Sequence, residues 1–175
     1  MIALQITELK VFMARLLGSN VFDDFLLQEA TLQMGISYVI DGHLNEAFYA
    51  ADADNEEAVD HTNTLTGQGL PKDAFVSYGE VRPTLFELIK GKRTPLGFQF
   101  VMQLSSKKSS LLFPEGLDAH LIKGLLMNIR YDGTKVLITS GLSYFSFSLD
   151  KAPELIWDEA LMHFLHSAGI AFEQI

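Results

Sequence analysis

Residues 124–149 read GLLMNIRYDGTKVLITSGLSYFSFSL and carry the strongest short-range fold signal in the chain. Two runs in which apolar and polar residues alternate flank the pair Asp132-Gly133. This pair favours a hairpin, because a type I′ turn needs positive φ at both central residues and Asp and Gly accept it. A third run follows at Gly141. The pattern therefore predicts an antiparallel meander over 124–149.

Alternation with a period of two also extends over residues 30–40. The apolar residues fall on the even positions Ala30, Leu32, Met34, Ile36, Tyr38 and Ile40. Such a strand has one buried face and one solvated face. With a reversal near Gly35, the segment 25–40 is predicted to form a hairpin, and the alternation that begins at Phe98 predicts a strand over 97–104.

Three further segments have apolar residues at helical spacing: 7–17, 83–90 and 152–168. Thr7 suits an N-cap, and Pro83 and Pro153 suit the first helical position. Strand runs mixed with amphipathic helices, without regular βαβ alternation, predict an α+β fold with a mainly antiparallel sheet. We expect a single domain over 1–175 that contains a long mobile loop at about 50–73, where no periodicity is visible.

Composition narrows the possible chemistry. The chain has 175 residues and no cysteine, so disulfides, thiolate catalysis and thiolate metal sites are excluded. No apolar run approaches the roughly 20 residues that a membrane helix needs, and the N-terminal segment lacks the pattern of a signal peptide. These features predict a cytoplasmic protein with no membrane partner.

Charge is unevenly distributed along the chain. The net charge is −9, which argues against a free-standing nucleic-acid binder. The stretch 41–61 has acidic residues but no Lys or Arg, whereas a basic cluster follows at Arg82, Lys90, Lys92 and Arg93. This cluster predicts contact with an anionic ligand or a nucleic-acid backbone. The alternative is that these cations compensate a helix dipole and solubilise a loop.

Four short strings give the chain a family resemblance. They are Ile40-Asp-Gly-His-Leu-Asn, Leu88-Ile-Lys-Gly-Lys-Arg-Thr-Pro, Tyr131-Asp-Gly-Thr and Trp157-Asp-Glu. With them the chain resembles an uncharacterised bacterial family, a domain of unknown function, over nearly its whole length except 50–73. The resemblance implies no activity.

A second resemblance is local. Residues 135–149 are similar to the last strand pair of a bacterial DNA sliding-clamp domain, where a strand ending in Ser-Gly precedes a Ser-x-Phe strand. A clamp-like topology would place the helices 7–17 and 83–90 side by side with a shared basic face that includes Lys10 and Arg15. A clamp chain carries two or three such domains, however, and the helix 152–168 has no counterpart in one of them. Similarity of fold alone does not transfer function.

Asp41 and His43 are the remaining candidates for chemistry. At a strand end they would serve as an acid/base or metal pair, but a turn at Asp41-Gly42 explains them as well, because a metal site needs further ligands. We therefore predict no catalytic residues and no cofactor, and favour a non-catalytic binding or assembly module.

Two other functions stay open. An enzyme acting on a phosphorylated small molecule would need Asp41, His43 and Lys92 in one cleft. A carrier of an apolar ligand would need a cavity of about 300 Å³ or more beneath the helix 152–168. Exposed strand edges also predict a homodimer.

Overall fold

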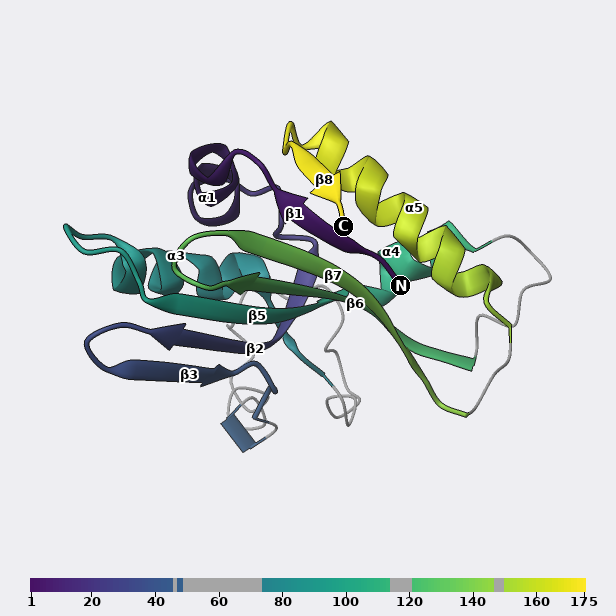
Figure 1. Cartoon of the computed structure of the whole chain (residues 1–175). Helices are drawn as coiled ribbons and strands as arrows, with labels where there is room; N and C mark the ends of the chain where they lie inside the picture. Colours follow the sequence, from purple (N-terminus) through teal and green to yellow (C-terminus); the bar gives the residue numbers. More distant parts are fainter. Residues whose placement is uncertain (46, 49–73, 114–120, 147–149) are drawn as a thin grey trace.

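The computed structural model describes residues 1–45, 47–48, 74–113, 121–146 and 150–175 (Figure 1). It confirms the α+β prediction. The elements in chain order are β1 (Ala3–Ile6), α1 (Leu9–Gly18), β2 (Phe25–Gln33), β3 (Ser37–Asp41), β4 (Val76–Ser77), α3 (Tyr78–Ile89), β5 (Gly97–Leu104), α4 (Ser106–Leu112), β6 (Ile122–Tyr131), β7 (Val136–Tyr144), α5 (Ala152–Ser167) and β8 (Phe172–Gln174). The predicted loop 50–73 lies outside the described residues.

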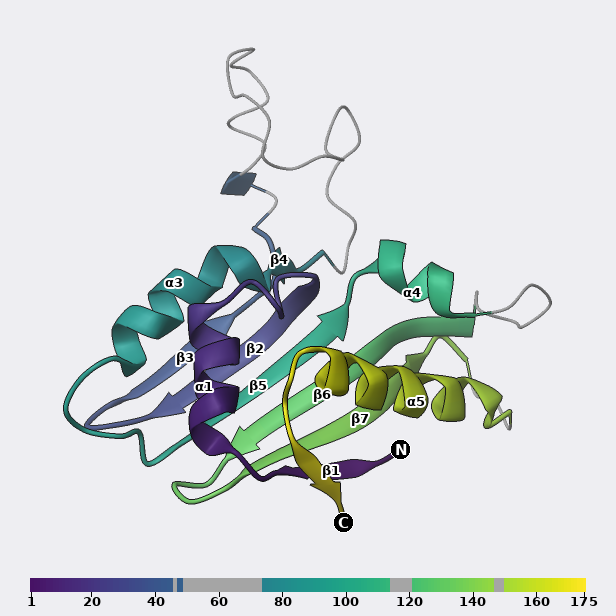
Figure 2. The same cartoon turned by 90° about the horizontal axis from the view of Figure 1, so that it is seen from above.

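The strands form one antiparallel sheet. Its order is β3-β2-β5-β6-β7-β1-β8, and β4 pairs with β2. The helices α1, α3 and α5 all lie over the same face of this sheet (Figure 2). The opposite face has no helix on it in the described part of the chain. We call it the open face.

Alternation along the strands decides which side chains each face receives. Phe100 on β5 stands opposite Ala30 on β2 and Ile129 on β6, and all three are fully buried beneath the helices. The residues between them point the other way, so that Gln99 stands opposite Thr31 and Arg130 on the open face. The strands with one apolar and one polar face, as predicted, therefore form a single core on the helix-covered side of the sheet.

An aromatic cluster joins the helices to the sheet. Phe22, in the connection between α1 and β2, is fully buried. Its ring lies 6.1 Å from that of Phe12, 6.5 Å from that of Tyr78 and 5.3 Å from that of Phe164. The contacts are edge-to-face, the arrangement that the quadrupoles of two rings favour. One side chain thus ties α1, α3 and α5 together.

Two boundary predictions for the helices are wrong. The helix predicted at 83–90 begins at Tyr78, so Pro83 lies inside α3. Proline has no N–H to donate to the preceding turn of the helix. α3 tolerates this loss at Pro83, because the burial of Tyr78 anchors the first residue of the helix. Thr7 is also not the N-cap of α1: that position is Glu8, and the Thr7 N–H donates to Ala171 O instead. The short helix Ser106–Leu112 is not among the helices that the sequence pattern predicts.

The predicted meander is a single hairpin. The Asp132 N–H donates to Lys135 O, so the central pair of the turn is Gly133-Thr134, one residue later than predicted. The φ angle of Gly133 is 94°, which suits glycine. β7 continues through Gly141, because Gly141 stays paired with Leu126 on β6. No third strand begins there. The other hairpin, β2–β3, agrees with the prediction.

The aromatic cluster gives a direct test of the packing. We predict that Phe22→Ala lowers the free energy of unfolding by about 3–5 kcal/mol, because it empties a site among the rings of Phe12, Tyr78 and Phe164. Phe145→Ala is the matched control, since Phe145 is 69% exposed, and we expect it to change that free energy by less than about 0.5 kcal/mol. Urea denaturation measures both variants. Equal effects would contradict the packing described.

Candidate functional site

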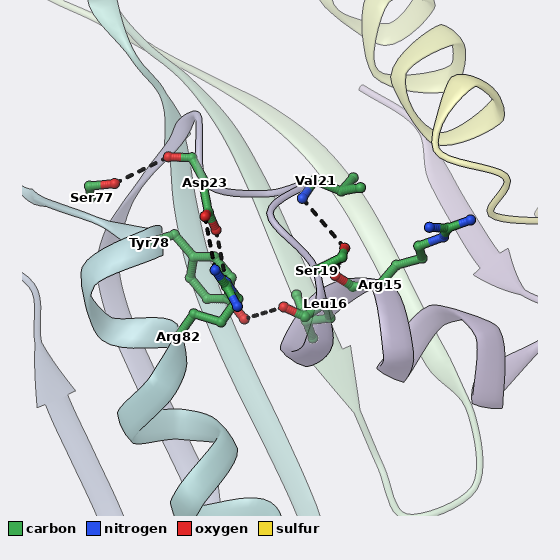
Figure 3. A network of polar contacts seen from close by, with 8 residues as sticks. All are labelled: Arg15, Leu16, Ser19, Val21, Asp23, Ser77, Tyr78 and Arg82. Atoms are coloured by element: carbon green, nitrogen blue, oxygen red, sulfur yellow. Dashed lines mark hydrogen bonds and ion pairs between the residues drawn. The ribbon is translucent and has the colours of Figure 1, made fainter.

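Arg82 belongs to a structural network (Figure 3). Its Nε donates to Asp23 Oδ1 at 2.9 Å and its second terminal nitrogen to Asp23 Oδ2 at 3.0 Å. The two side chains are only 22% and 30% exposed. The hydrogen bond that Arg82 donates to the Asp23 carboxylate raises the pKa of Arg82. Arg82 is therefore occupied in holding α3 to the segment that precedes β2.

The same network includes Tyr78. Its hydroxyl donates to Leu16 O at 3.0 Å, and Ser77 Oγ donates to Asp23 O at 3.1 Å. Burial raises the pKa of Tyr78, so its hydroxyl keeps the proton that it donates. α1 and α3 lie beside each other at this point (Figure 3), as the clamp-like topology requires. The network nonetheless removes Arg82 from a free basic surface.

The other predicted cations lie at the far end of α3. Lys90 pairs with Glu87 one turn earlier on the helix. Lys92 and Arg93 lie exposed in the loop between α3 and β5, with no hydrogen-bond or ion-pair partner among the described residues. Eight residues of helix, about 12 Å, separate Arg82 from Lys90. The structure therefore keeps Lys90, Lys92 and Arg93 together and separates Arg82 from them.

Asp41 and His43 form a local turn. The Asp41 carboxylate accepts the His43 N–H at 3.0 Å and lies 2.6 Å from its Nδ1. The hydrogen bond from the backbone of His43 lowers the pKa of Asp41. The residue between them must be glycine, because a Cβ at Gly42 would lie 1.8 Å from Leu27 O. No group of three His, Asp or Glu side chains that would hold a metal occurs in the described ranges.

These two residues and Lys92 do not share a cleft. Asp41 stands opposite Glu29, whereas the loop that contains Lys92 rejoins the sheet where the Leu96 N–H donates to Gln33 O. Four residues of β2 separate these points, which is about 13 Å. Figure 1 shows the loop at the end of the sheet where the β2–β3 turn lies, away from the end of β3. The arrangement that the enzyme hypothesis requires is absent from the described part.

One buried carboxylate is fully engaged elsewhere. Asp158 on α5 accepts the hydroxyl of Ser140 on β7 and lies 2.9 Å from the amino group of Met1. Ser140 Oγ in turn accepts the Ile2 N–H. These contacts join α5 to β1 and β7, and they account for the only buried charged side chain among the residues described.

A depression with a volume of about 400 Å³ lies on the open face. It is lined by Thr31, Gln33, Leu96, Gly97, Phe98, Gln99, Arg130, Tyr131 and Asp132. Gly97 stands opposite Gln33 at the start of β5 and has no side chain to fill the space. A Cβ there would also lie 2.9 Å from Tyr131 O. The hollow is therefore built by a glycine surrounded by longer polar side chains.

Arg130 is the cation of this depression. It stands opposite Gln99, which stands opposite Thr31 on the next strand, so guanidinium, amide and hydroxyl follow one another across the sheet. The Arg130 side chain is exposed and has no hydrogen-bond or ion-pair partner in the part of the chain that the structure describes. A free guanidinium beside neutral hydrogen-bonding groups is suited to hold a carboxylate or a phosphate.

Asp132 is the anion of the depression. Hydrogen bonds from the Lys135 N–H, and from the hydroxyl and N–H of Thr134, lower its pKa to about 2. The carboxylate is therefore ionised at neutral pH, and these bonds hold it toward the turn. The turn itself lies against the α3–β5 loop, since a Cβ at Gly133 would be 2.9 Å from Leu96 O. The loop with Lys92 and Arg93 thus ends at the rim of the depression.

Sequence reasoning missed Arg130 as a site residue. The period of two placed it on the solvated side of its strand, and the same holds for Gln99 and Thr31. Their convergence depends on the register of three strands, which a single sequence does not reveal. The available signal was one isolated cation inside a predicted strand, between Ile129 and Tyr131.

The structural role of Arg82 is testable against a loop cation. We predict that Arg82→Gln lowers the free energy of unfolding by about 1–2 kcal/mol, because it leaves the half-buried Asp23 carboxylate without two charged hydrogen bonds. The effect is smaller than for a fully buried pair, since solvent screens the partly exposed charges. Lys92→Gln should change it by less than about 0.5 kcal/mol. Urea denaturation of both variants decides, and an Arg82→Gln variant as stable as Lys92→Gln would show that the network is not structural.

Comparison with known proteins places the chain in a family. No curated protein and no solved structure matches it. The local resemblance to a sliding-clamp domain stays a prediction. None of the described helices has the length and apolar character needed to cross a membrane. A family model matches residues 15–173, which confirms the predicted relation to a domain family of unknown function. The chain belongs to DUF5721, a family of unknown function.

Proposed function

We propose that this chain is a non-catalytic binding module that holds an anionic group of a small molecule in the depression around Gly97. The observation that supports it best is the exposed guanidinium of Arg130 at a hollow of about 400 Å³, without a partner among the described residues. Pockets for small molecules typically begin at about 300 Å³. The depression is therefore large enough for such a ligand.

Arg130 provides the main attraction. A guanidinium presents a planar fork of N–H donors that matches the two oxygens of a carboxylate or phosphate. Because no ion pair within the described chain engages it, ligand binding breaks no such contact. The Gln99 amide adds a neutral donor on the same side, whereas the Thr31 hydroxyl donates to Glu29 Oε1 at 3.3 Å. The charged Asp132 follows Arg130 by two residues and repels an anion, so we expect the anionic group to lie toward Gln99.

The surrounding loop supports the same function. Lys92 and Arg93 lie on the loop that reaches the rim at Leu96, and Lys135 follows the adjacent turn. In a chain whose net charge is −9, this concentration of cations attracts anions to one end of the sheet. The basic cluster predicted from sequence thus contributes long-range attraction through Lys92 and Arg93, while Arg130 makes the contact.

The two alternative functions fit less well. An enzyme would need groups that converge on a reacting atom, and Asp41 and His43 lie apart from the depression. A carrier of an apolar ligand would need an apolar hollow, but this one is lined mostly by polar side chains. The second depression, near Ser106 and Lys123 at α4, holds only about 180 Å³. Neither hollow meets the requirement for a buried apolar ligand.

Substitution of the guanidinium tests the proposal. We predict that Arg130→Gln weakens the binding of inorganic phosphate, or of citrate as a carboxylate probe, by about 10- to 100-fold, because it removes a charged hydrogen-bonding pair. Isothermal titration calorimetry measures the Kd. Arg15→Gln is the matched control, since Arg15 is an exposed arginine of α1 on the helix-covered side. Equal affinities in all three proteins, or no binding of either probe, would contradict the proposal.

An oligonucleotide serves as a comparison probe. Binding to a nucleic-acid backbone falls steeply with salt, because several counterions are released, and it would involve Lys92 and Arg93 together with Arg130. A single bound anion gives a shallow salt dependence. Tight oligonucleotide binding with a steep salt dependence, lost in Lys92→Glu, would favour the nucleic-acid partner over the small molecule.

A further inference from the structure

β3 forms one edge of the sheet, and its outward backbone groups can be assigned. The Gly42 N–H donates to Gln28 O, and the Met34 N–H donates to Ile36 O. In an antiparallel pair, alternate residues direct both backbone groups to the same neighbour. The even residues of β3 therefore bond to β2, and the odd residues Ser37, Val39 and Asp41 direct theirs away from it.

This edge is unpaired within the described residues. No described strand pairs with the outer side of Ser37–Asp41. Pairing resumes only beyond it, where His43 forms a bridge with Phe75. Three consecutive outward N–H and C=O pairs are thus available, in line, for one more strand.

The residues of β3 also lack the usual protection of a sheet edge. Natural edges are guarded by lysine, proline, a bulge or very short length. β3 has five residues with no lysine, proline or bulge, and its one charged residue, Asp41, stands at its end. Val39 is 69% exposed, and Ile36 at the adjoining turn is 65% exposed. At the other edge of the sheet, β8 has only three residues and includes Glu173.

We propose that two copies of this chain pair through β3, antiparallel, with Val39 of one copy opposite Val39 of the other. In this register Ser37 stands opposite Asp41, so a hydroxyl meets a carboxylate, and Tyr38 stands opposite Ile40. No like charges stand opposite each other. The two Asp41 carboxylates are four residues apart along the strands, about 13 Å, which exceeds the screening length at physiological salt.

Other two-fold registers are poorer. A pair centred on Asp41 sets two carboxylates directly opposite each other, which is destabilising. A pair centred on Ile40 would require His43, whose edge is already used by Phe75. A pair centred on Tyr38 leaves Asp41 without an outward partner on the other strand. Only the Val39-centred register pairs all three outward residues of both copies, and this self-complementarity favours a second copy over an unrelated strand.

The dimer would form one continuous sheet. A two-fold axis at an antiparallel strand pair is perpendicular to the sheet, so both open faces lie on the same side. Both depressions around Gly97 would then open in the same direction. The pairing does not depend on ligand binding, and it is testable whether or not the proposed anion site is correct.

Charge at the centre of the interface gives the first test. We expect the chain to sediment as a dimer with a Kd in the micromolar range, and Val39→Lys to raise that Kd at least tenfold, because two ammonium groups would stand opposite each other. Leu155→Lys, at a residue of α5 that is 63% exposed, should leave it unchanged. Circular dichroism checks that each variant is folded. A monomer at every concentration, or a dimer that survives Val39→Lys, overturns the proposal.

Cross-linking tests the register itself. The chain has no cysteine, so a single introduced cysteine can form a disulfide only with another copy. We expect Val39→Cys to cross-link with itself under mild oxidation, since opposite residues of a hydrogen-bonded pair lie about 5.5 Å apart between Cα atoms. Ser37→Cys and Asp41→Cys should each form no disulfide alone and should cross-link when the two variants are mixed. The reverse pattern, or cross-linking no faster than that of exposed Leu155→Cys, contradicts this register.

Discussion

Burial of only one face of the sheet is the constraint on which the rest of this structure depends. α1, α3 and α5 all cover the same side, so each strand must supply apolar residues to that side and polar residues to the other. Phe100 beneath the helices and Gln99 beside it illustrate the rule. The rule also explains why the chain needs Phe22: a single covered face requires three helices to pack against one another as well as against the strands, and an aromatic cluster does this at their meeting point.

The open face is where variation is structurally tolerated and where we place function. Its side chains contribute little to the core, so their identity is free to serve a ligand. Gly97 removes one side chain from this face and leaves a hollow, and the register of β2, β5 and β6 brings Thr31, Gln99 and Arg130 to its side. The only ionised carboxylate at the hollow is tied to the hairpin turn, which leaves the guanidinium as its free charge among the described residues.

Sequence patterns predicted the fold better than the site. Period-two alternation located both hairpins, because alternation reports burial directly. The predicted start of a helix was wrong where a tertiary contact outweighed a local preference. Tyr78 and the Arg82–Asp23 pair extend α3 back beyond Pro83. The prediction of the site residues was wrong for a different reason. The predicted basic cluster falls within twelve residues of sequence, yet Arg82 is engaged inside the structure. Arg130, by contrast, meets Gln99 only across a strand pairing that no local pattern encodes.

The account is tested most directly by mapping where an anion binds. Amide chemical shifts in a ¹⁵N-labelled sample, followed during titration with inorganic phosphate, report the contact residue by residue. The account predicts saturable shifts confined to the open face near Gly97, Gln99 and Arg130, with α1 and the Arg82 network unaffected. Shifts that centre on the helices, or that spread over both faces without saturating, would contradict it.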